Sequence, residues 1–437
     1  MTDRPLKQIH LAAHFPGVNN TTVWSDPASG SHIEFESFRH LAQTAERGKF
    51  DFFFLAEGLR LRETNGRIHD LDVVGRPESI TVLNALAAVT ERIGLAATVN
   101  ATFNEPYELA RRFASLDHLS GGRAAWNVVT SSDAFTGENF RRGGYLDRAD
   151  RYTRAAEFVE LARKLWDSGD TRGFADTGDA EVRHAGRQFE VRGWLSLPRP
   201  PQGHPVVIQA GDSDEGREFA AAAADVIFSR HSTLADGQAF HRDVKRRLAG
   251  YGRKPDELKI LPAATFVLGD TDADAAERAA EVRRAQVGPQ TTINYLEQVW
   301  GVDLSGHDPD GPLPTVDPDP DSALVQGRVR LPDPAGTAAR WRALAAEKNL
   351  TSRELVIEVT GRQSFIGSPA TVAGQINHFV QNDAADGYVL VPHLTPGGLD
   401  EFVDRVVPLL QERGVFRTDY TGPTLRDHLG LPVPGRR

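Results

Sequence analysis

The sequence FESFRHLAQTAERGKFDFFFL (Phe35–Leu55) joins two patterns of different period. Between Phe35 and Arg47, apolar residues recur every three to four positions, which predicts an amphipathic helix. From Phe50 to Leu55 the residues are almost all apolar, which is typical of a buried strand. A helix that leads into a buried strand is the repeating unit of a parallel sheet.

The same alternation continues along the whole chain. Apolar runs of strand length lie at Ile9–Ala13, Phe50–Leu55, Ile93–Val99, Ala124–Val129, Val206–Gln209, Val226–Phe228, Leu261–Leu268 and Tyr388–Val391. Helical stretches lie between them, among them Pro106–Leu119, Arg154–Trp166 and Leu399–Gln411, and Ser368-Pro369 predicts an N-cap followed by a first-turn proline. Eight strand–helix units predict an α/β fold, a closed (β/α)8 TIM barrel, with an open doubly wound sheet as the alternative.

Three stretches interrupt the repeat and are predicted to be insertions at the rim of a single barrel spanning residues 1–437. Residues 132–150 are polar and rich in glycine, and residues 168–203 contain Phe189–Trp194, which predicts a hairpin. Residues 305–336 are acidic and rich in proline, with too little apolar content for a core of their own. We expect this last segment to be a mobile lid or a poorly ordered loop.

Composition excludes several kinds of chemistry. The 437 residues include no cysteine, which removes disulfides, thiol nucleophiles, iron–sulfur clusters and cysteine-type zinc sites. The formal charge of -10 disfavours a nucleic-acid partner. No apolar run is long enough to span a membrane, and the N-terminus lacks the apolar core of a signal peptide, so we expect a cytoplasmic protein.

The common nucleotide, protease and metal motifs are also missing. There is no GxGxxG, no GxxxxGK[ST] and no HExxH. The stretch Gly211–Arg217 has the glycine spacing of a P-loop but ends in arginine where lysine is needed. His10 and His14 are four residues apart on a predicted strand, not on a helix, so we expect no metal site.

One stretch nevertheless suits a phosphate. The strand ending at Gln209 is followed by a loop containing Gly211 and by a helix that begins at Ser213. The first turn of a helix offers unpaired backbone N–H groups and a positive dipole end to an anion. The alternative is a helix N-cap that binds no ligand.

Several motifs, in order along nearly the whole chain, resemble one family. They are Phe52–Gly58 (FFFLAEG), Thr102–Tyr107 (TFNEPY), Leu116–Arg123 (LDHLSGGR), Trp126–Ser131 (WNVVTS), Asp150–Tyr152 (DRY), Gln209–Ser213 (QAGDS), Pro396–Asp400 (PGGLD) and Thr424–Gly430 (TLRDHLG). Together they resemble the nitrilotriacetate monooxygenase, pristinamycin IIA synthase and dibenzothiophene-sulfone monooxygenase family of luciferase-like flavoproteins.

The resemblance implies a luciferase-type barrel and a two-component reaction. Members bind FMNH2 delivered by a separate NAD(P)H:flavin reductase, let it react with O2 and transfer one oxygen atom to a small N-, S- or ring-containing substrate. A dimer or tetramer of identical chains is also implied. No residue identifies the substrate. A non-catalytic flavin-binding barrel and a deazaflavin-dependent oxidoreductase remain alternatives.

The resemblance also implies roles for individual residues. The flavin contacts are Glu57, Thr102, Thr130, Ser131, Arg148, Tyr152, Gly211 and Ser213, the substrate side holds His14, Asn19 and Trp24, and the catalytic candidates are His14, Asn127 and Ser132. Three positions depart from the family pattern. Glu57 stands where aspartate is usual, Arg148 where many members have histidine, and Ser132 where some relatives have a histidine implicated in catalysis.

Overall fold

The computed structural model is described over most of the chain. The described residues are 5–16, 21–61, 63–64, 67–68, 76–131, 134–140, 148–169, 181–322, 325–326, 333–360 and 364–435. Two predicted site residues, Asn19 and Ser132, lie outside these ranges, and so does the side chain of Arg148. No helix in the described part of the chain combines the length and apolar character that crossing a bilayer requires.

Eight parallel strands close into a barrel. They are β1 (His10–His14), β2 (Phe52–Leu55), β5 (Gly94–Asn100), β6 (Ala124–Val129), β9 (Val206–Ala210), β10 (Val226–Ser229), β11 (Lys259–Leu268) and β14 (Gly387–Val391). Each strand pairs with the next in chain order, and β14 returns to β1 with Gly387 opposite His10. The predicted barrel is therefore confirmed over the open sheet, and every predicted strand is present within two residues of its expected ends.

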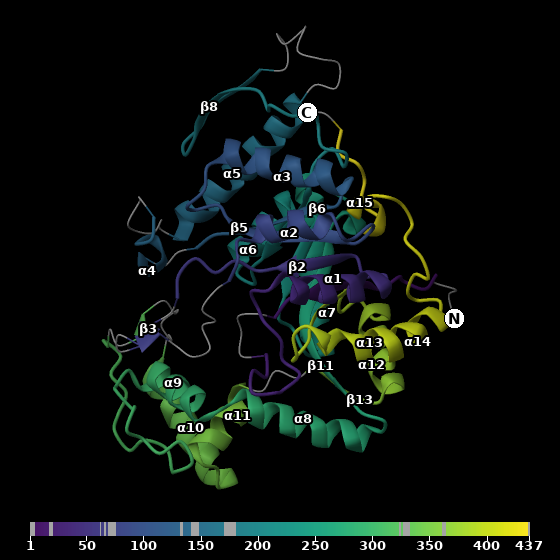
Figure 1. Cartoon of the computed structure of the whole chain (residues 1–437). Helices are drawn as coiled ribbons and strands as arrows, with labels where there is room; N and C mark the ends of the chain where they lie inside the picture. Colours follow the sequence, from purple (N-terminus) through teal and green to yellow (C-terminus); the bar gives the residue numbers. More distant parts are fainter. Residues whose placement is uncertain are drawn as a thin grey trace.

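Helices surround this barrel (Figure 1). They are α1 (Phe35–Arg47), α2 (Ser79–Ala87), α3 (Pro106–Ser120), α5 (Arg148–Ser168), α6 (Asp214–Ala223), α7 (Leu234–Leu248), α8 (Asp272–Gln286), α12 (Pro369–Gln381), α13 (Asp400–Arg405) and α14 (Val407–Glu412). The α12 cap is confirmed, because the Ser368 hydroxyl accepts from the Thr371 N–H at 3.4 Å.

Two helices differ from their predicted bounds. The helix expected to start at Arg154 begins at Arg148, so Tyr152 lies in its second turn. The single helix expected over Leu399–Gln411 is wrong, since it breaks at Val406 into α13 and α14. Pro408 accounts for the break, because proline has no N–H to donate to the preceding turn.

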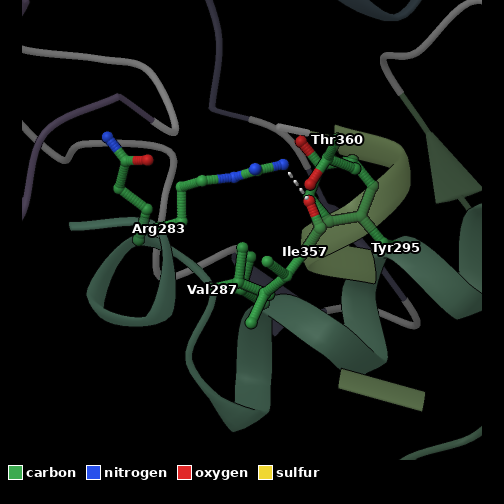
Figure 2. A pocket seen from close by; sticks show the side chains of 7 residues that line it. Arg283, Val287, Tyr295, Ile357 and Thr360 are labelled. Atoms are coloured by element: carbon green, nitrogen blue, oxygen red, sulfur yellow. Dashed lines mark hydrogen bonds between the residues drawn. The ribbon is translucent and has the colours of Figure 1, made fainter. Parts of the chain in front are cut away.

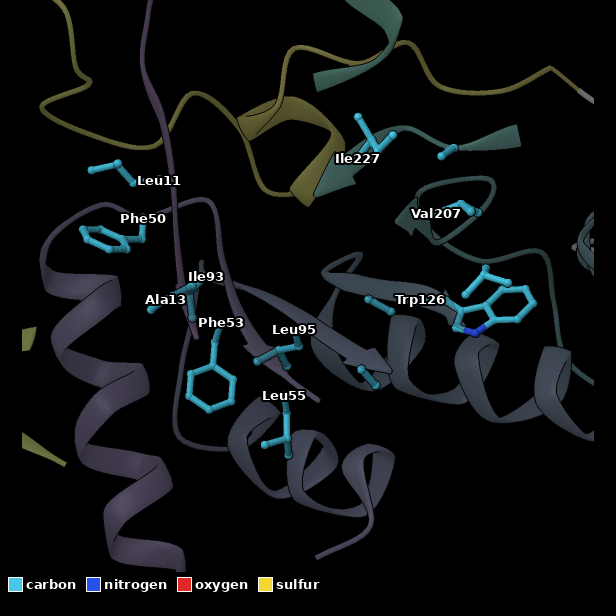
Figure 3. Close-up of a cluster of buried hydrophobic side chains, with 14 of the residues drawn as sticks. Leu11, Ala13, Phe50, Phe53, Leu55, Ile93, Leu95, Trp126, Val207 and Ile227 are labelled. Carbon is cyan, nitrogen blue, oxygen red and sulfur yellow. The ribbon is translucent and has the colours of Figure 1, made fainter. Parts of the chain in front are cut away.

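Successive residues of each strand face two different cores. In β2, Phe53 and Leu55 face outward into the large core between strands and helices (Figure 3). Phe52 and Phe54 face inward and join a smaller core inside the barrel. This alternation follows from the two-residue period of an extended chain, and an almost wholly apolar strand such as β2 satisfies both cores.

The C-terminal segment closes the amino end of the barrel. Leu425, in α15 (Leu425–His428), belongs to the core inside the barrel together with Leu429 and Leu431. A Cβ atom added at Gly94, the first residue of β5, would lie 2.6 Å from the side chain of Leu425, so only glycine leaves room for it. With this end filled, a ligand has access to the barrel only from the carboxyl ends of the strands.

A helical excursion, residues 287–360, separates α8 from the last part of the barrel. It contains α9 (Pro289–Trp300), α10 (Pro334–Lys348) and α11 (Ser352–Thr360), which pack around a small core of their own that includes Trp300. These helices were not predicted. Segment 305–322 lies against them, with the Trp300 indole N–H donating to the Val316 carbonyl at 2.9 Å. The segment needs little apolar content because the helices supply it.

The remaining elements are short. They are β3 (Glu63–Thr64), β4 (Arg67–Ile68), α4 (Ala134–Gly137), β7 (Val182–Ala185), β8 (Glu190–Gly193), η1 (Ala249–Tyr251), η2 (Pro255–Glu257), β12 (Val325–Gln326), β13 (Phe365–Gly367) and η3 (Gly397–Leu399). The stretch Phe189–Trp194, predicted to form a hairpin, supplies only one of its two strands. That strand is β8, and it pairs with the earlier β7. In the excursion, β12 pairs with β3, which follows the carboxyl end of β2.

Candidate active site at the carboxyl end of the barrel

The described site candidates gather where the parallel strands end. His14 closes β1, Glu57 follows β2, and Thr102 follows β5. Asn127, Thr130 and Ser131 lie at the end of β6, and Gly211 and Ser213 follow β9. Since these strands are parallel and closed into a ring, their carboxyl ends share one rim.

Asn100, the last residue of β5, connects three of the predicted flavin contacts. Its backbone N–H donates to the Glu57 carboxylate at 3.1 Å, and its side-chain amide donates to the Ser131 hydroxyl at 2.5 Å. Its side-chain oxygen accepts from the Thr102 N–H at 2.6 Å. Asn100 is fully buried. It therefore fixes the positions of Glu57, Thr102 and Ser131 relative to one another.

The carboxyl group of Glu57 is partly buried beside this network. Burial, with the nearby charge of Glu78, raises the pKa of Glu57 to about 8, although the Asn100 N–H and Arg76 act in the opposite direction. A carboxyl group with this pKa holds its proton near neutral pH. Glu57 can therefore donate a hydrogen bond to a ligand at the rim.

Asn127 points into the barrel from β6. Its side-chain N–H donates to the Thr98 hydroxyl at 2.9 Å, while its side-chain oxygen is buried with no partner among the described residues. Thr130 contributes its backbone carbonyl, which accepts from Arg151 at 3.3 Å. Asn127 thus keeps one acceptor for a ligand.

His14 lies inside the barrel mouth, with its ring 5.1 Å from that of Phe54. Burial, together with the charge of Arg76, lowers the pKa of His14 to about 3, so the imidazole is neutral. Its Nε2 atom is buried and finds no partner in the described structure. His10 lies at the opposite end of β1, where its Nδ1 atom is 3.0 Å from Asp51. The two histidines are four positions apart, which is a rise of about 13 Å along the strand, too far for them to share a metal.

Tyr152 and the start of α6 lie side by side. The Ser213 hydroxyl caps α6 by accepting from the Gly216 N–H at 3.1 Å. A Cβ atom added at Gly216 would lie 3.1 Å from the Tyr152 hydroxyl, and one added at Gly211 would lie 3.3 Å from it. The structure therefore brings Tyr152, Gly211 and Ser213 to one place, where a side chain on either glycine would crowd the Tyr152 hydroxyl.

Buried polar atoms without a partner among the described residues gather at this rim. Besides His14 and Asn127 they include the Gln209 side-chain oxygen, Asp212 Oδ1 and the Ser229 hydroxyl, and also Trp24 Nε1, His231 Nε2 and His393 Nδ1. Buried polar groups are normally hydrogen-bonded, so these atoms have bonding capacity left for a polar ligand or for water. Sequence reasoning missed Gln209, Ser229, His231 and His393. The only signal for them was a polar residue at or just after an apolar strand.

Comparison with known proteins gives the same family throughout. The family model described as luciferase-like monooxygenase matches residues 16–387. Nitrilotriacetate monooxygenase component A of Aminobacter aminovorans is 41% identical, covering 94% of this chain and 93% of the relative. N-acetyl-S-(2-succino)cysteine monooxygenase of Bacillus subtilis is 41% identical, and the match covers 99% of this chain and 98% of the relative. A crystal structure of riboflavin lyase with modified FMN and riboflavin superposes with a TM-score of 0.78 at 29% identity. The superposition covers 98% of this chain and 97% of the lyase chain. The chain belongs to the luciferase-like monooxygenase family.

Proposed function

We propose that this protein is the oxygenase component of a two-component, FMN-dependent monooxygenase. FMNH2 would come from a separate NAD(P)H:flavin reductase, and one oxygen atom of O2 would pass to a small organic substrate containing nitrogen, sulfur or a ring. The relative named as a component A supports a divided system of this kind. We expect the protein to act in the cytoplasm, as a dimer or tetramer of this chain.

The observation that carries this proposal is the set of buried polar atoms at the rim that have no partner among the described residues. They comprise acceptors such as the Asn127 and Gln209 side-chain oxygens and groups such as the Ser229 hydroxyl that can also donate. The polar edge of a reduced flavin ring presents both N–H and C=O groups. The residues present therefore fit a flavin better than they fit a wholly apolar ligand.

We propose that the phosphate of FMN binds beside the first turn of α6. The hydroxyl of Tyr152 lies close to this turn, and Ser213 is the N-cap of the helix. A helix N-terminus stabilises an anion through its free N–H groups and its dipole. Only one such loop was found in the sequence, which favours FMN over FAD.

The chain's own residues would hold the ring and keep it dry. Reduced flavin, when bound, supplies the electrons that activate O2. Glu57, protonated near neutral pH, would donate to the ring edge from the position that the Asn100 N–H gives it. Phe54 and Phe228, whose rings are 4.9 Å apart, form an apolar floor under the mouth that excludes water from below.

Anaerobic calorimetry with FMN, FMNH2 and FAD tests the cofactor independently of any substrate. We expect FMNH2 to bind most tightly, and a preference for FAD would contradict the proposal. Binding of a deazaflavin in place of FMNH2 would favour the oxidoreductase alternative.

Turnover with 18O2, NADH, FMN and a flavin reductase tests the reaction itself. Nitrilotriacetate and N-acetyl-S-(2-succino)cysteine, the substrates in the relatives' names, are the first compounds to try. We expect one labelled oxygen atom in the product. Tight FMNH2 binding with only H2O2 formed across a broad set of substrates would instead favour the non-catalytic flavin-binding barrel.

A further inference from the structure

A small open pocket lies between α8, α9 and α11, outside the set of residues assigned to the flavin. Its polar lining consists of Arg283 and Gln286 from α8, Thr291 and Tyr295 from α9, and Thr360 from α11. Figure 2 shows the Arg283 side chain extended across the pocket toward Thr360 and the carbonyl of Ile357. Among the described residues that line the pocket, one side chain is cationic and none is acidic.

The guanidinium of Arg283 has hydrogen-bonding capacity to spare. It carries five N–H donors, and one terminal nitrogen donates to the Ile357 carbonyl at 2.9 Å. Its Nε atom is buried without a partner in the described part of the chain. The acidic residue after Ile357, Glu358, forms its ion pair with Lys348 at 2.6 Å, and the charge of Arg283 acts on it only from a longer distance. A buried donor on a cation calls for an anionic acceptor.

The size of the pocket limits what that acceptor can be. Its volume is about 30 Å³, whereas one water molecule needs about 10–15 Å³ of such space. The pocket therefore holds about two oxygen atoms, which is the head of a carboxylate, and the rest of such a ligand must extend outside it. Arginine matches a carboxylate with two parallel hydrogen bonds.

The pocket adjoins the chain segment that follows β1. The Gln286 side-chain amide donates to the Thr21 carbonyl. The hydroxyl of the next residue, Thr22, is buried without a partner among the described residues, and so is the indole N–H of Trp24. Trp24 belongs to the predicted substrate side. A ligand whose carboxylate lies at Arg283 thus extends along a segment that offers further donors.

We propose that Arg283 is a specificity-determining residue that binds a carboxylate group of the substrate, so that the substrate class is small organic carboxylates. This inference rests on the proposed monooxygenase function. It is consistent with the two relatives whose named substrates, nitrilotriacetate and N-acetyl-S-(2-succino)cysteine, both carry carboxylates. The pocket acts on binding and orientation, not on the oxygen-transfer step.

Binding measurements on the full chain test the proposal with two acids and their methyl esters as probes. Nitrilotriacetate and N-acetyl-S-(2-succino)cysteine are titrated into metal-free protein, each beside its neutral trimethyl ester. We expect at least one acid to bind about 10-fold or more tightly than its ester. Arg283→Gln should weaken binding of that acid by about 10-fold or more, because it removes a charged hydrogen-bond donor, and should leave the ester unaffected.

Arg284→Gln is the matched control, since it removes the same charge from the next, exposed position of α8. It should change binding of the acid by less than about twofold. Arg283→Lys keeps the charge but loses the planar fork, so it should weaken binding partially, and it becomes the deciding variant if Arg283→Gln does not fold. Equal binding of acids and esters, an unchanged Kd in the Arg283 variants, or an equal loss in Arg284→Gln would each overturn the proposal. FMNH2 affinity, measured on the same proteins, reports separately on the proposed function.

Discussion

A Cβ atom placed on Gly216 would lie 3.1 Å from the hydroxyl oxygen of Tyr152, although the two residues are 64 positions apart in the chain. The second helical turn of α5 and the first turn of α6 therefore meet at one point of the barrel rim. That point combines a phenolic hydroxyl with the amino end of a helix, where the helix dipole is positive. The combination suits a phosphate.

Ser213→Ala should weaken FMNH2 binding by about 10- to 100-fold, because a hydrogen bond to a charged acceptor contributes about 1.5–3 kcal/mol. Tyr152→Phe should have the same effect more mildly. Anaerobic titration gives both affinities, and the substrate KM at saturating flavin should change little. If Ser213→Ala leaves the flavin Kd unchanged in folded protein, the phosphate lies elsewhere.

Ser213→Ala also lowers the stability of the protein, and this effect needs a control. The substitution removes an N-cap, which costs about 1 kcal/mol of stability. Thr233→Ala removes the matching cap from α7, where the Thr233 hydroxyl accepts from the Asp236 N–H at 3.2 Å. This control should lower Tm by a similar amount without changing flavin affinity.

Glu57→Gln should stabilise the protein more at high pH than at low pH. The pKa of Glu57 is about 8 in the folded state against 4.5 ordinarily, so the folded carboxyl keeps a proton that the unfolded chain releases. Wild-type stability is therefore lost as pH rises from about 4.5 to about 8, with a limiting slope of about 1.4 kcal/mol per pH unit for one proton. Glutamine cannot ionise and escapes this loss.

Urea unfolding of wild type and Glu57→Gln at pH values from 5 to 9 measures this difference. The difference in unfolding free energy should grow with pH and level off above about 8. A difference that is constant across this range would show that Glu57 titrates normally.

Asp51→Asn should destabilise the barrel by about 3–5 kcal/mol, because it leaves Arg417 buried without its counter-charge. Burial alone would raise the pKa of Asp51, but Arg417 and His10 hold it well below the usual range. Its stabilising effect is therefore present above the ordinary pKa of 3.8 and is lost as pH falls below that value.

The double variant Asp51→Asn/Arg417→Met separates the ion pair from the rest of the fold. Removing both charges should recover much of the lost stability in chemical denaturation. FMNH2 affinity should be unchanged in every folded variant, since Asp51 lies at the amino end of the barrel. A flavin effect from Asp51→Asn would contradict this separation of the two ends.

Arg342→Ala should increase the H2O2 released per FMNH2 oxidised by about twofold or more, if the insertion 305–336 covers the mouth as the sequence predicts. Arg342 donates from α10 to the Pro314 carbonyl at 3.0 Å and to the Val316 carbonyl. Its loss frees the segment while the barrel stays folded. Deleting all of 305–336 is a poorer test, because it also removes β12 and the start of α10.

Arg340→Ala is the control for this prediction. Arg340 lies on the same helix but contacts Asp333 and Thr337 rather than the segment. It should leave H2O2 release at the wild-type level. The same H2O2 yield in Arg342→Ala would show that segment 305–322 has no part in excluding water.

The sequence by itself determined the eight strands of the barrel, their order and several of the helices between them. The all-apolar run that ends at Leu55, the helical period of Phe35–Arg47 and the cap at Ser368 depend on neighbours within a few residues, so they could be predicted correctly. Eight repeats of one strand–helix unit then allowed few topologies, since the crossover connections between parallel strands are right-handed. The ordered motifs identified the family for the same reason, because each motif is a short local pattern.

The tertiary structure alone decided the contacts between distant residues and the electrostatics that follow from them. Nothing near Glu57 in sequence predicts its raised pKa, which comes from burial and from the nearby charge of Glu78. The packing of α9–α11 around Trp300 and the approach of Tyr152 to Gly216 likewise depend on long-range folding. Burial and pairing are properties of the folded chain, and a residue's own neighbours in the sequence do not fix them.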